Sequence, residues 1–444
     1  MRTTMGGGNL EEEDYYHGLL PREDIPHLLI KEGDFLVRSS ETAPNQPRQV
    51  IISILVEKMG AIVRHIVVQQ NIHGKYVTDA RASFHSVPEL IQFYRNCGEP
   101  VLSTVPKAIL KRAITRAPWE LRHETVIIEN KIGEGEFGEV FSGKYKLPTG
   151  RVVEVAIKLA KKAEMSKEKI KEMMKEARLM RNYEHPNVIR MYGVCVEHEP
   201  LLIVMELVDG GALDDFLKKN RVSVKDKIEK MVAGGAWGLE YLHSKNCIHR
   251  DIAARNCLLT RTGIVERPFL LHVKISDFGL SREGDEYQMT KARRVPIKWL
   301  APETIQRLVY TSKTDVWSYG VMVWEIFANA AEPYPGMTNA EVKEKVTNGY
   351  KMLFAPEAPP WIVEIVHNGC WQLNPDRRAN MGQIARWIEQ NAGITAPVVI
   401  TPPLLVTKSG VSAAKRKGNE GTDIKKSKIM KKKLKKSKKR KINK

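Results

Sequence analysis

The feature that most constrains the fold is a series of short motifs that follow one another in order along the middle of the chain. The first is Gly133-Glu-Gly135-Glu-Phe137-Gly138-Glu-Val140, which lies between two strand-like runs. Glycines here let a hairpin backbone approach a triphosphate without Cβ clashes, and they expose N–H groups to phosphate oxygens. The loop lacks a following helix and the Lys-Ser/Thr pair of a Walker loop, which argues against both common Gly-rich nucleotide motifs. Alone, it is a weak signal.

A single lysine, Lys158, ends the apolar run Val155-Ala156-Ile157 that follows this loop. A lysine in a strand can simply extend to water from the edge of a sheet. Beside a Gly-rich loop, we favour a buried cation that binds phosphate. Such a cation needs an anionic partner, and the amphipathic helix expected over residues 167–181 offers Glu176 and, one turn earlier, Glu172. Glu176 is preferred because it lies beside the apolar residues of the packed face, whereas a surface pair with a neighbouring lysine is the alternative for either glutamate.

Three further motifs make the pattern specific: His249-Arg250-Asp251-Ile-Ala-Ala-Arg255-Asn256, Asp277-Phe278-Gly279 and Ala301-Pro302-Glu303. With the Gly-rich loop and the Val-Ala-Ile-Lys run, they occur in the order of the protein-kinase signature set, which this part of the chain resembles. The resemblance implies a bilobal kinase fold with ATP and Mg²⁺ as cofactors. Ala253-Ala254-Arg255 and Val295-Pro296-Ile297-Lys298-Trp299 are similar to protein-tyrosine kinases, so tyrosine hydroxyls of protein substrates are the implied acceptors.

The resemblance also implies a role for each polar residue of these motifs. Phosphoryl transfer needs in-line placement and neutralised charge rather than covalent work by the protein. Asp251 would orient the substrate hydroxyl, with Arg255 beside it in the catalytic set. Asn256 and Asp277 would supply hard oxygen ligands for Mg²⁺.

The nucleotide site is implied in the same way. Lys158, paired with Glu176, would contact the α- and β-phosphates, and Met205 matches the position that shapes the back of the nucleotide pocket. The implied ATP-binding residues are Ile132, Gly133, Gly135, Phe137, Gly138, Val140, Ala156, Lys158, Met205, Glu206 and Leu258.

Tyr287 lies between the Asp277 and Glu303 motifs. It is either a solvent-facing loop tyrosine or a phosphosite, and the kinase resemblance favours the phosphosite. A phosphate there would add negative charge that Arg250, and also Arg282, could pair with. By the same resemblance, Arg378 is expected to form an ion pair with Glu303.

Residues 15–105 read as a small α+β module. Strand-like runs occur at FLVRSS, QVIISILV and VRHIVVQQ, and helical patterns begin near Arg22 and at SVPELIQFYRN. The order Tyr15-Tyr16-His17-Gly18, Arg22 and Phe35-Leu36-Val37-Arg38-Ser39-Ser40 resembles an SH2 domain. Arg38 on a buried strand would be costly without an anion, and a bidentate guanidinium–phosphate pair suits phosphotyrosine. By resemblance Arg22, Ser40 and His65 complete the pocket, with Thr42 as a weaker candidate.

The order of SH2 domain, short linker and tyrosine kinase, with Pro118-Trp119-Glu120-Leu121 before the large module, most resembles the Fer/Fes group of non-receptor tyrosine kinases. The expected fold class is α+β. The expected organisation is a flexible N-terminus (1–14), SH2 domain (15–105), linker (106–124), kinase domain (125–391) and flexible tail (392–444, Lys-rich from 415).

The net charge of +19, from 71 basic and 52 acidic residues, is concentrated in that tail. Residues 415–444 hold 16 Lys or Arg and two acidic residues, so the remaining chain carries only +5. Such a run cannot bury a core and is expected to be disordered. Three roles compete for it: a solvated tail, a nuclear-localisation or nucleic-acid patch, and an anchor on anionic lipid. The absence of aromatics argues against base stacking, and membrane surface and nuclear import machinery are equally favoured partners.

The five cysteines form no CxxC pair, which argues against a disulfide scaffold or zinc site and for a reducing compartment. We therefore expect a cytoplasmic protein, with peripheral plasma-membrane or partly nuclear location set by the tail. A different class of function is a scaffold that acts through its SH2 domain and carries a silent kinase fold. Retention of Lys158, Asp251 and Asp277 disfavours that hypothesis.

Overall fold

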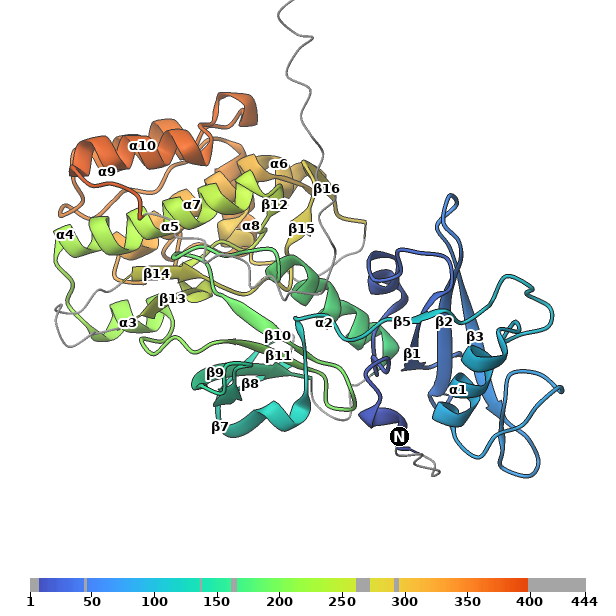
Figure 1. The fold of residues 1–444 in the computed structure, drawn as a ribbon. Coiled ribbons are helices and arrows are strands. Elements are labelled where there is room, and N and C mark those ends of the chain that lie inside the picture. Colours follow the sequence, from blue (N-terminus) through green and yellow to red (C-terminus); the bar gives the residue numbers. More distant parts are fainter. Residues whose placement is uncertain are drawn as a thin grey trace, which may run out of the picture. The chain divides into compact units, whose positions relative to one another are not determined.

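The computed structural model describes residues 8–43, 46–135, 138–160, 166–260, 272–290 and 295–397. These residues belong to one compact unit, Met1–Val399. Within it, the small domain (residues 15–105) and the large domain (residues 125–391) each contain helices and sheets, as the α+β prediction requires (Figure 1). The Lys-rich segment 415–444, and with it the prediction of a disordered tail, lies outside the described residues.

The small domain is built on a five-stranded sheet with the order β4-β3-β2-β1-β5. β1 to β4 pair antiparallel in sequence order, and β5 adds parallel to β1. The three long strands coincide with the predicted apolar runs. The strands are β1 (Asp34–Ser40), β2 (Gln49–Glu57), β3 (Ile62–Gln70), β4 (Tyr76–Val77) and β5 (Arg112–Ala113).

The two predicted helices of the small domain have different outcomes. α1 (Val87–Cys97) forms as expected, because Ser86 caps its first turn by accepting from the Glu89 amide and Gly98 ends it at φ 69°. The helix predicted from Arg22 is instead a 3₁₀ helix, η2 (Arg22–His27). Pro26 lies inside this segment and has no backbone N–H to donate, so the sequence does not support a longer α-helix.

The segment 106–124, predicted as a linker, takes part in both domains. Its strand β5 extends the small sheet, and its strand β6 (Glu120–Leu121) pairs parallel with β10 of the large domain. A 3₁₀ turn, η3 (His123–Thr125), completes it. Two-residue strands are too short to show a period, so the sequence pattern could not reveal them.

The first part of the large domain is a six-stranded sheet with the order β6-β10-β11-β9-β8-β7, and α2 (Lys167–Met180) packs against it. The β8/β9 register sets Val140 opposite Lys158, and the β11/β9 register sets Met205 opposite Ala156. The remaining strands are β7 (Val126–Gly135), β8 (Gly138–Lys146), β9 (Val152–Leu159), β10 (Met191–Cys195) and β11 (Leu202–Glu206).

The rest of the large domain is mostly helical, and Figure 1 shows α5 and α10 packed beside each other. Residues 224–244 are helical throughout and include a π-helical segment, η5. The helical elements are α3 (Leu213–Lys219), α4 (Val224–Asp226), η5 (Lys227–Val232), α5 (Ala233–Ser244), η6 (Ala254–Asn256), η7 (Ile297–Trp299), α6 (Pro302–Arg307), α7 (Ser312–Phe327), α8 (Asn339–Thr347), α9 (Pro360–Glu364), η8 (Ile365–Cys370, π-helical), η9 (Pro375–Arg377) and α10 (Met381–Ala392).

Three short antiparallel strand pairs border these helices and carry the functional loops. They are β12 (Cys247–Ile248) with β15 (Arg282–Glu283), β13 (Cys257–Thr260) with β14 (His272–Ile275), and β16 (Glu286–Gln288) with β17 (Val309–Thr311). α7 is buried along almost its whole length, so it forms the centre of the helical core.

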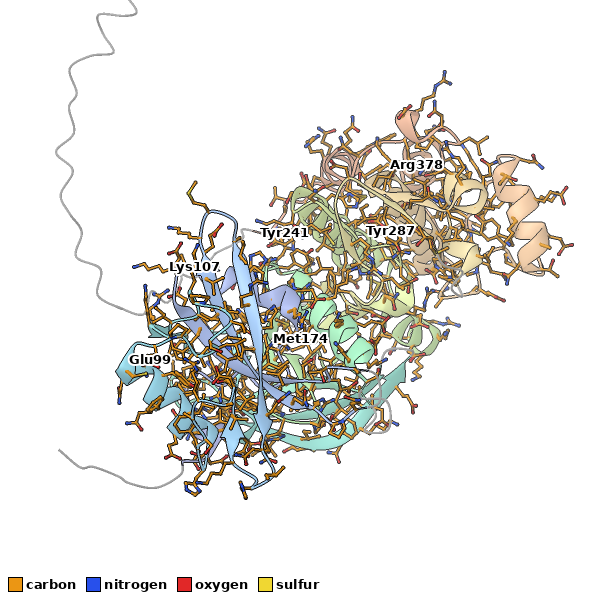
Figure 2. The ribbon with its side chains drawn as sticks, turned by 90° about the vertical axis from the view of Figure 1, so that its right-hand side faces the viewer. Glu99, Lys107, Met174, Tyr241, Tyr287 and Arg378 are labelled. Atoms are coloured by element: carbon orange, nitrogen blue, oxygen red, sulfur yellow. The ribbon has the colours of Figure 1, made fainter. Side chains whose placement is uncertain are left out.

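One hydrophobic cluster joins the two domains. Leu20 and Leu36 of the small domain pack in the same cluster as Met173 and Met174 on α2. Figure 2 labels Met174 on this helix. Buried Asp24 adds a bidentate ion pair, accepting from Arg178 Nε at 2.9 Å and from a terminal guanidinium nitrogen at 2.8 Å. The small domain therefore fixes the position of α2.

All five cysteines are free thiols. In the described part of the chain, no helix is long and apolar enough to cross a bilayer.

Candidate functional site

Lys158 on β9 and Glu176 on α2 form a buried ion pair. Lys158 Nζ donates to both carboxylate oxygens of Glu176, each at 2.8 Å. Burial alone would lower the pKa of Lys158, but the negative charges of Glu176 and Asp277 outweigh it and raise this pKa. The lysine is thus held as a cation. The pairing expected for Glu176 is present, whereas Glu172 lies on the exposed side of α2.

Asp251 is held by two donors. Arg255 donates to Asp251 Oδ1 at 2.5 Å, and Asn256 Nδ2 donates to Asp251 Oδ2 at 2.7 Å. The Arg255 guanidinium also lies 4.4 Å from the ring centroid of Trp299. The structure thus brings three predicted catalytic-loop residues together around one carboxylate, whose orientation is fixed from both sides.

Buried Asp315 on α7 anchors the backbone of this loop. Its carboxylate accepts from the amides of His249 at 2.7 Å and Arg250 at 2.8 Å, and His243 Nε2 lies 3.1 Å away. Arg250 has φ 73°, a conformation that is uncommon for a non-glycine residue. Strained backbone of this kind persists only where its surroundings over-determine it, as the Asp315 contacts do here.

Asp277 lies next to the Lys158–Glu176 pair, with Oδ1 3.9 Å from Lys158 Nζ. Its backbone has φ 60°, a second strained position in the site. The following Phe278 is buried, with ring centroids 5.2 Å from His249 and 5.4 Å from Tyr183. Packing of Phe278 into the core therefore turns the Asp277 carboxylate towards the lysine.

Asn256 and Asp277 have the donor chemistry that a divalent metal requires. Asn256 Nδ2 donates to the backbone oxygen of Asp251 at 2.8 Å and to Asp251 Oδ2 at 2.7 Å. The amide oxygen of Asn256 is therefore directed elsewhere. The Asp277 side chain is 39% exposed and can reach a ligand. A carboxylate and an amide oxygen completed by phosphates and water suit Mg²⁺, which keeps few protein ligands.

The Gly-rich hairpin is formed by β7 and β8. Gly133 pairs with Val140 and Gly135 with Gly138, while Phe137 lies outside the described residues. Gly138 has φ 143°, and a Cβ atom there would lie 2.4 Å from the Leu159 carbonyl oxygen. Glycine is required at this position because the hairpin closes onto β9.

The apolar nucleotide-site residues come from several strands. Ile132 on β7 is 52% exposed and so offers apolar surface to a ligand, while Ala156 on β9 and Leu258 on β13 are partly buried. The Glu206 side chain contacts other residues of the protein. Its Oε1 accepts from the Arg190 amide at 2.7 Å and pairs with Lys274 Nζ at 2.9 Å, so this carboxylate oxygen is already engaged within the protein.

Tyr287 is half-buried on β16 rather than solvent-facing. The Arg250 guanidinium lies 4.3 Å from its ring centroid and 4.3 Å from that of Tyr310, and Arg282 lies 5.3 Å from the Tyr287 ring. Within the part of the chain that the structure describes, Arg250 Nε and Arg282 Nε are buried without a hydrogen-bond acceptor. The structure thus places both expected arginines at the candidate phosphosite.

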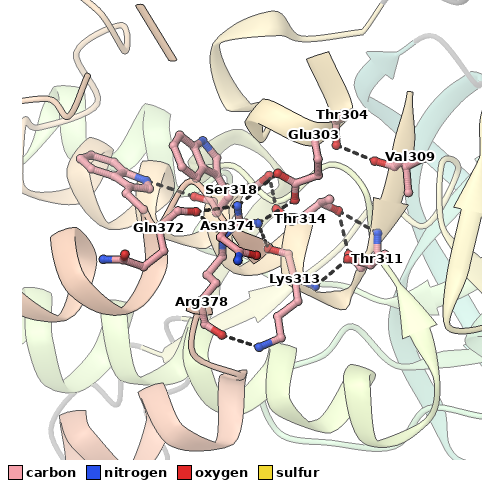
Figure 3. Close-up of polar contacts among 12 residues, drawn as sticks. Glu303, Thr304, Val309, Thr311, Lys313, Thr314, Ser318, Gln372, Asn374 and Arg378 are labelled. Atoms are coloured by element: carbon pink, nitrogen blue, oxygen red, sulfur yellow. Dashed lines mark hydrogen bonds and ion pairs between the residues drawn. The ribbon is translucent and has the colours of Figure 1, made fainter. Parts of the chain in front are cut away.

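Glu303 and Arg378 form the expected ion pair (Figure 3). The two terminal guanidinium nitrogens donate to Glu303 Oε1 at 2.8 Å and Oε2 at 3.1 Å, and Arg378 also donates to the Lys313 and Gln372 carbonyls. This network ties α6 and the start of α7 to the segment before α10.

The four residues predicted to bind phosphotyrosine line one cavity of about 360 Å³: Arg22, Arg38, Ser40 and His65. Buried Arg38 donates to Ser53 Oγ at 3.3 Å and lies 3.5 Å from the Leu20 carbonyl, so both of these acceptors are neutral. Burial and then the positive charge of Arg22 lower the pKa of Arg38 to about 10. Burial and the charges of Arg38 and Arg22 lower the pKa of His65 to about 4. A cavity with this electrostatic character favours an anion.

Comparisons with known proteins agree with this geometry. A family model for "Protein tyrosine and serine/threonine kinase" matches residues 126–388, and one for "SH2 domain" matches residues 15–94. Fer-related kinase 1 of Caenorhabditis elegans is 39% identical over 384 residues, which cover 86% of this chain and 94% of that protein. The chain belongs to the protein-tyrosine kinase family.

Two further relatives place this kinase in the Fer/Fes type. Human tyrosine-protein kinase Fer is 36% identical over 85% of this chain, and the transforming protein Fps of avian sarcoma virus (strain PRCII) is 36% identical over 84%. The chain spans 44% of human Fer and 66% of that Fps protein. It is a non-receptor tyrosine kinase with an SH2 domain that binds phosphotyrosine.

Sequence reasoning missed several residues of the kinase. Lys167 and Lys171 of α2 line the SH2 cavity together with Arg48. Their spacing of four residues around apolar Ile170 puts both lysines on one helix face, but nothing in the local sequence indicates which surface that face contacts.

Glu325 of α7 was also missed. It accepts from the Ala254 amide and the Trp299 indole, each at 3.0 Å, and burial raises its pKa to about 7.

Proposed function

We propose that Asp251, Asn256, Asp277 and the Lys158–Glu176 pair are the working phosphoryl-transfer site of this protein-tyrosine kinase. The observation that supports the proposal best is the buried Lys158–Glu176 pair with Asp277 beside it. In protein kinases, the lysine–glutamate ion pair and the metal-binding aspartate must both be in place for catalysis.

In this proposal Asp251 accepts a hydrogen bond from the tyrosine hydroxyl and aims its oxygen at the γ-phosphate of ATP. Arg255 and Asn256 keep the carboxylate oriented. Lys158 neutralises charge on the α- and β-phosphates. Mg²⁺ held by Asn256 and Asp277 would neutralise charge on the transferred group. Preorganised charges of this kind supply most of the rate enhancement in phosphoryl transfer.

In the SH2 domain, we propose that Arg38 binds the phosphotyrosine phosphate and that Arg22, Ser40 and His65 complete the site. A phosphomonoester dianion would supply a negative charge to pair with the buried guanidinium.

In the kinase domain, Tyr287 is the proposed phosphosite. Its phosphate would accept from the buried Nε donors of Arg250 and Arg282 and order the surrounding segment.

For the location of the kinase, we propose a cytoplasmic enzyme whose Lys-rich segment 415–444 engages an anionic partner. Sixteen basic residues favour an acidic membrane surface or the nuclear import machinery. Truncation after residue 414 distinguishes them: loss of sedimentation with phosphatidylserine vesicles supports the membrane, and loss of nuclear signal alone supports import. If neither changes, the tail is simply solvated.

The proposed metal and nucleotide roles are tested by Asp277→Asn. Calorimetric titration should show that Mg²⁺ no longer strengthens ATP binding to this variant, and phosphate transfer to a tyrosine peptide should fall at least about 100-fold. Glu172→Gln on the exposed side of α2 is the control. An Asp277→Asn protein with wild-type Mg²⁺ dependence would overturn the assignment.

A further inference from the structure

We infer that Lys167 and Lys171 of the kinase domain belong to the phosphotyrosine-binding site of the SH2 domain. Both domains then build the site, and the phosphate meets cations from each. The inference rests on the proposed phosphate-binding role of Arg38.

Both lysines border the same cavity as the four predicted SH2 residues. They lie one helical turn apart on α2, and Ile170 between them is buried in the cluster that joins the domains. Ile170 also borders the cavity, so this face of α2 forms one of its walls and carries both lysines. Lys169, on the same turn, lines a different cavity with Glu176 and Phe278.

Each lysine is tied to the SH2 segment that carries a phosphate-binding residue. Lys167 Nζ donates to the Glu41 carbonyl at 2.9 Å, next to Ser40. Lys171 Nζ pairs with Glu23 at 3.1 Å, next to Arg22. These contacts place both ammonium groups beside the proposed phosphate-binding residues before any phosphate is bound.

The position of α2, and with it the position of both lysines, is fixed against the SH2 domain. The bidentate Arg178–Asp24 pair and the shared apolar cluster hold the helix against the SH2 domain. The cations are therefore preorganised, which reduces the entropic cost of recruiting them to a ligand.

The charged residues that border the cavity also favour an anionic ligand. The SH2 domain itself lines the cavity with Arg22, Arg38 and Arg48, and Arg48 is already bonded to Glu199 of the kinase domain. Lys167 and Lys171 add two cations, while Glu41 is the one carboxylate among the described residues that border this cavity. A phosphate dianion gains charge-assisted hydrogen bonds from such groups, and we expect each lysine to contribute about three- to tenfold in affinity.

The test uses the full chain and phenyl phosphate, the smallest probe that carries both the phosphate and the aromatic ring. Binding is measured by NMR titration for wild type, Lys167→Gln, Lys171→Gln and the double variant. Lys169→Gln is the matched control, Lys→Arg changes at 167 and 171 test whether charge is what matters, and thermal unfolding verifies that each variant folds.

We expect each Lys→Gln change to weaken binding about three- to tenfold, the double variant more, and the Lys→Arg and Lys169→Gln variants less than about twofold. If both Lys→Gln variants bind like Lys169→Gln while Arg38→Ala abolishes binding, the shared site is wrong and the SH2 assignment stands. If Arg38→Ala also binds normally, the proposed phosphotyrosine site itself is wrong. Equal losses in the Lys→Arg and Lys→Gln variants would also overturn the inference, because they would indicate packing rather than charge.

Discussion

Lys158 Nζ on β9 lies 2.8 Å from each carboxylate oxygen of Glu176 on α2. The contact joins the strand that carries the phosphate-binding lysine to the helix that the SH2 domain holds in place through Asp24 and Arg178. The phosphate-binding cation, its partner and the phosphotyrosine pocket are consequently parts of one packed assembly centred on α2.

Because the pair is buried, removing one partner should cost more stability than removing both. We expect Glu176→Gln to destabilise the kinase by roughly 3 kcal/mol, since it leaves an uncompensated buried cation. The double variant Lys158→Met/Glu176→Leu should recover most of that loss in urea unfolding, yet remain inactive. Activity in the double variant, or additive destabilisation, would contradict the proposed role of the pair.

Tyr287 is expected to control activation. Preincubation of wild type with ATP should raise its rate of peptide phosphorylation, because a phosphate on Tyr287 would meet the buried donors of Arg250 and Arg282. Tyr287→Phe should show no rise, and mass spectrometry should find the phosphate on Tyr287 in wild type. Tyr350, which is exposed on the loop after α8, provides the control variant Tyr350→Phe. A full rise in Tyr287→Phe would exclude the phosphosite.

Glu325 should make stability depend on pH. Burial raises its folded pKa to about 7, above the ordinary 4.5, so its favourable contribution is complete below pH 4.5 and is lost as pH rises through 7. Glu325→Gln keeps an oxygen for the Ala254 and Trp299 donors but does not ionise. Urea unfolding from pH 5 to 8 should show wild type losing up to about 3 kcal/mol relative to Glu325→Gln. Parallel pH profiles would contradict the shift.

His65 should report ligand binding directly. Burial and the charges of Arg38 and Arg22 hold its pKa at about 4 in the ligand-free protein, and a phosphate beside it should raise that pKa because it favours the imidazolium. NMR titration of the imidazole with and without phenyl phosphate measures the change, with the exposed His73 as the control for non-specific effects. An unchanged His65 titration would mean that the phosphate binds elsewhere.

The sequence predicted the elements and residues whose evidence is local. The apolar runs of β1, β2 and β9 mark strands by composition, and the motif order places Asp251, Asn256 and Asp277 near one another through the family resemblance. The Glu176 choice followed from the packed face of a single helix.

What the sequence could not reveal depends on partners far apart in the chain. Asp24 and Arg178 are separated by 154 positions, and neither residue has a local pattern that indicates the other. Lys171 looks like any exposed helix lysine until the SH2 domain is placed beside it. Glu325 lies within an apolar helix, and its partner Trp299 becomes visible only when the chain has folded.

The central claim is that this chain is an active protein-tyrosine kinase that uses Asp251. The most direct test is the rate of phosphate transfer from ATP to two peptides that differ only in one tyrosine or serine, with wild type beside Asp251→Asn. Wild type should phosphorylate the tyrosine peptide alone, and Asp251→Asn should lower kcat at least about 100-fold while it binds ATP normally. An Asp251→Asn protein as fast as wild type, or equal transfer to serine, would contradict the account.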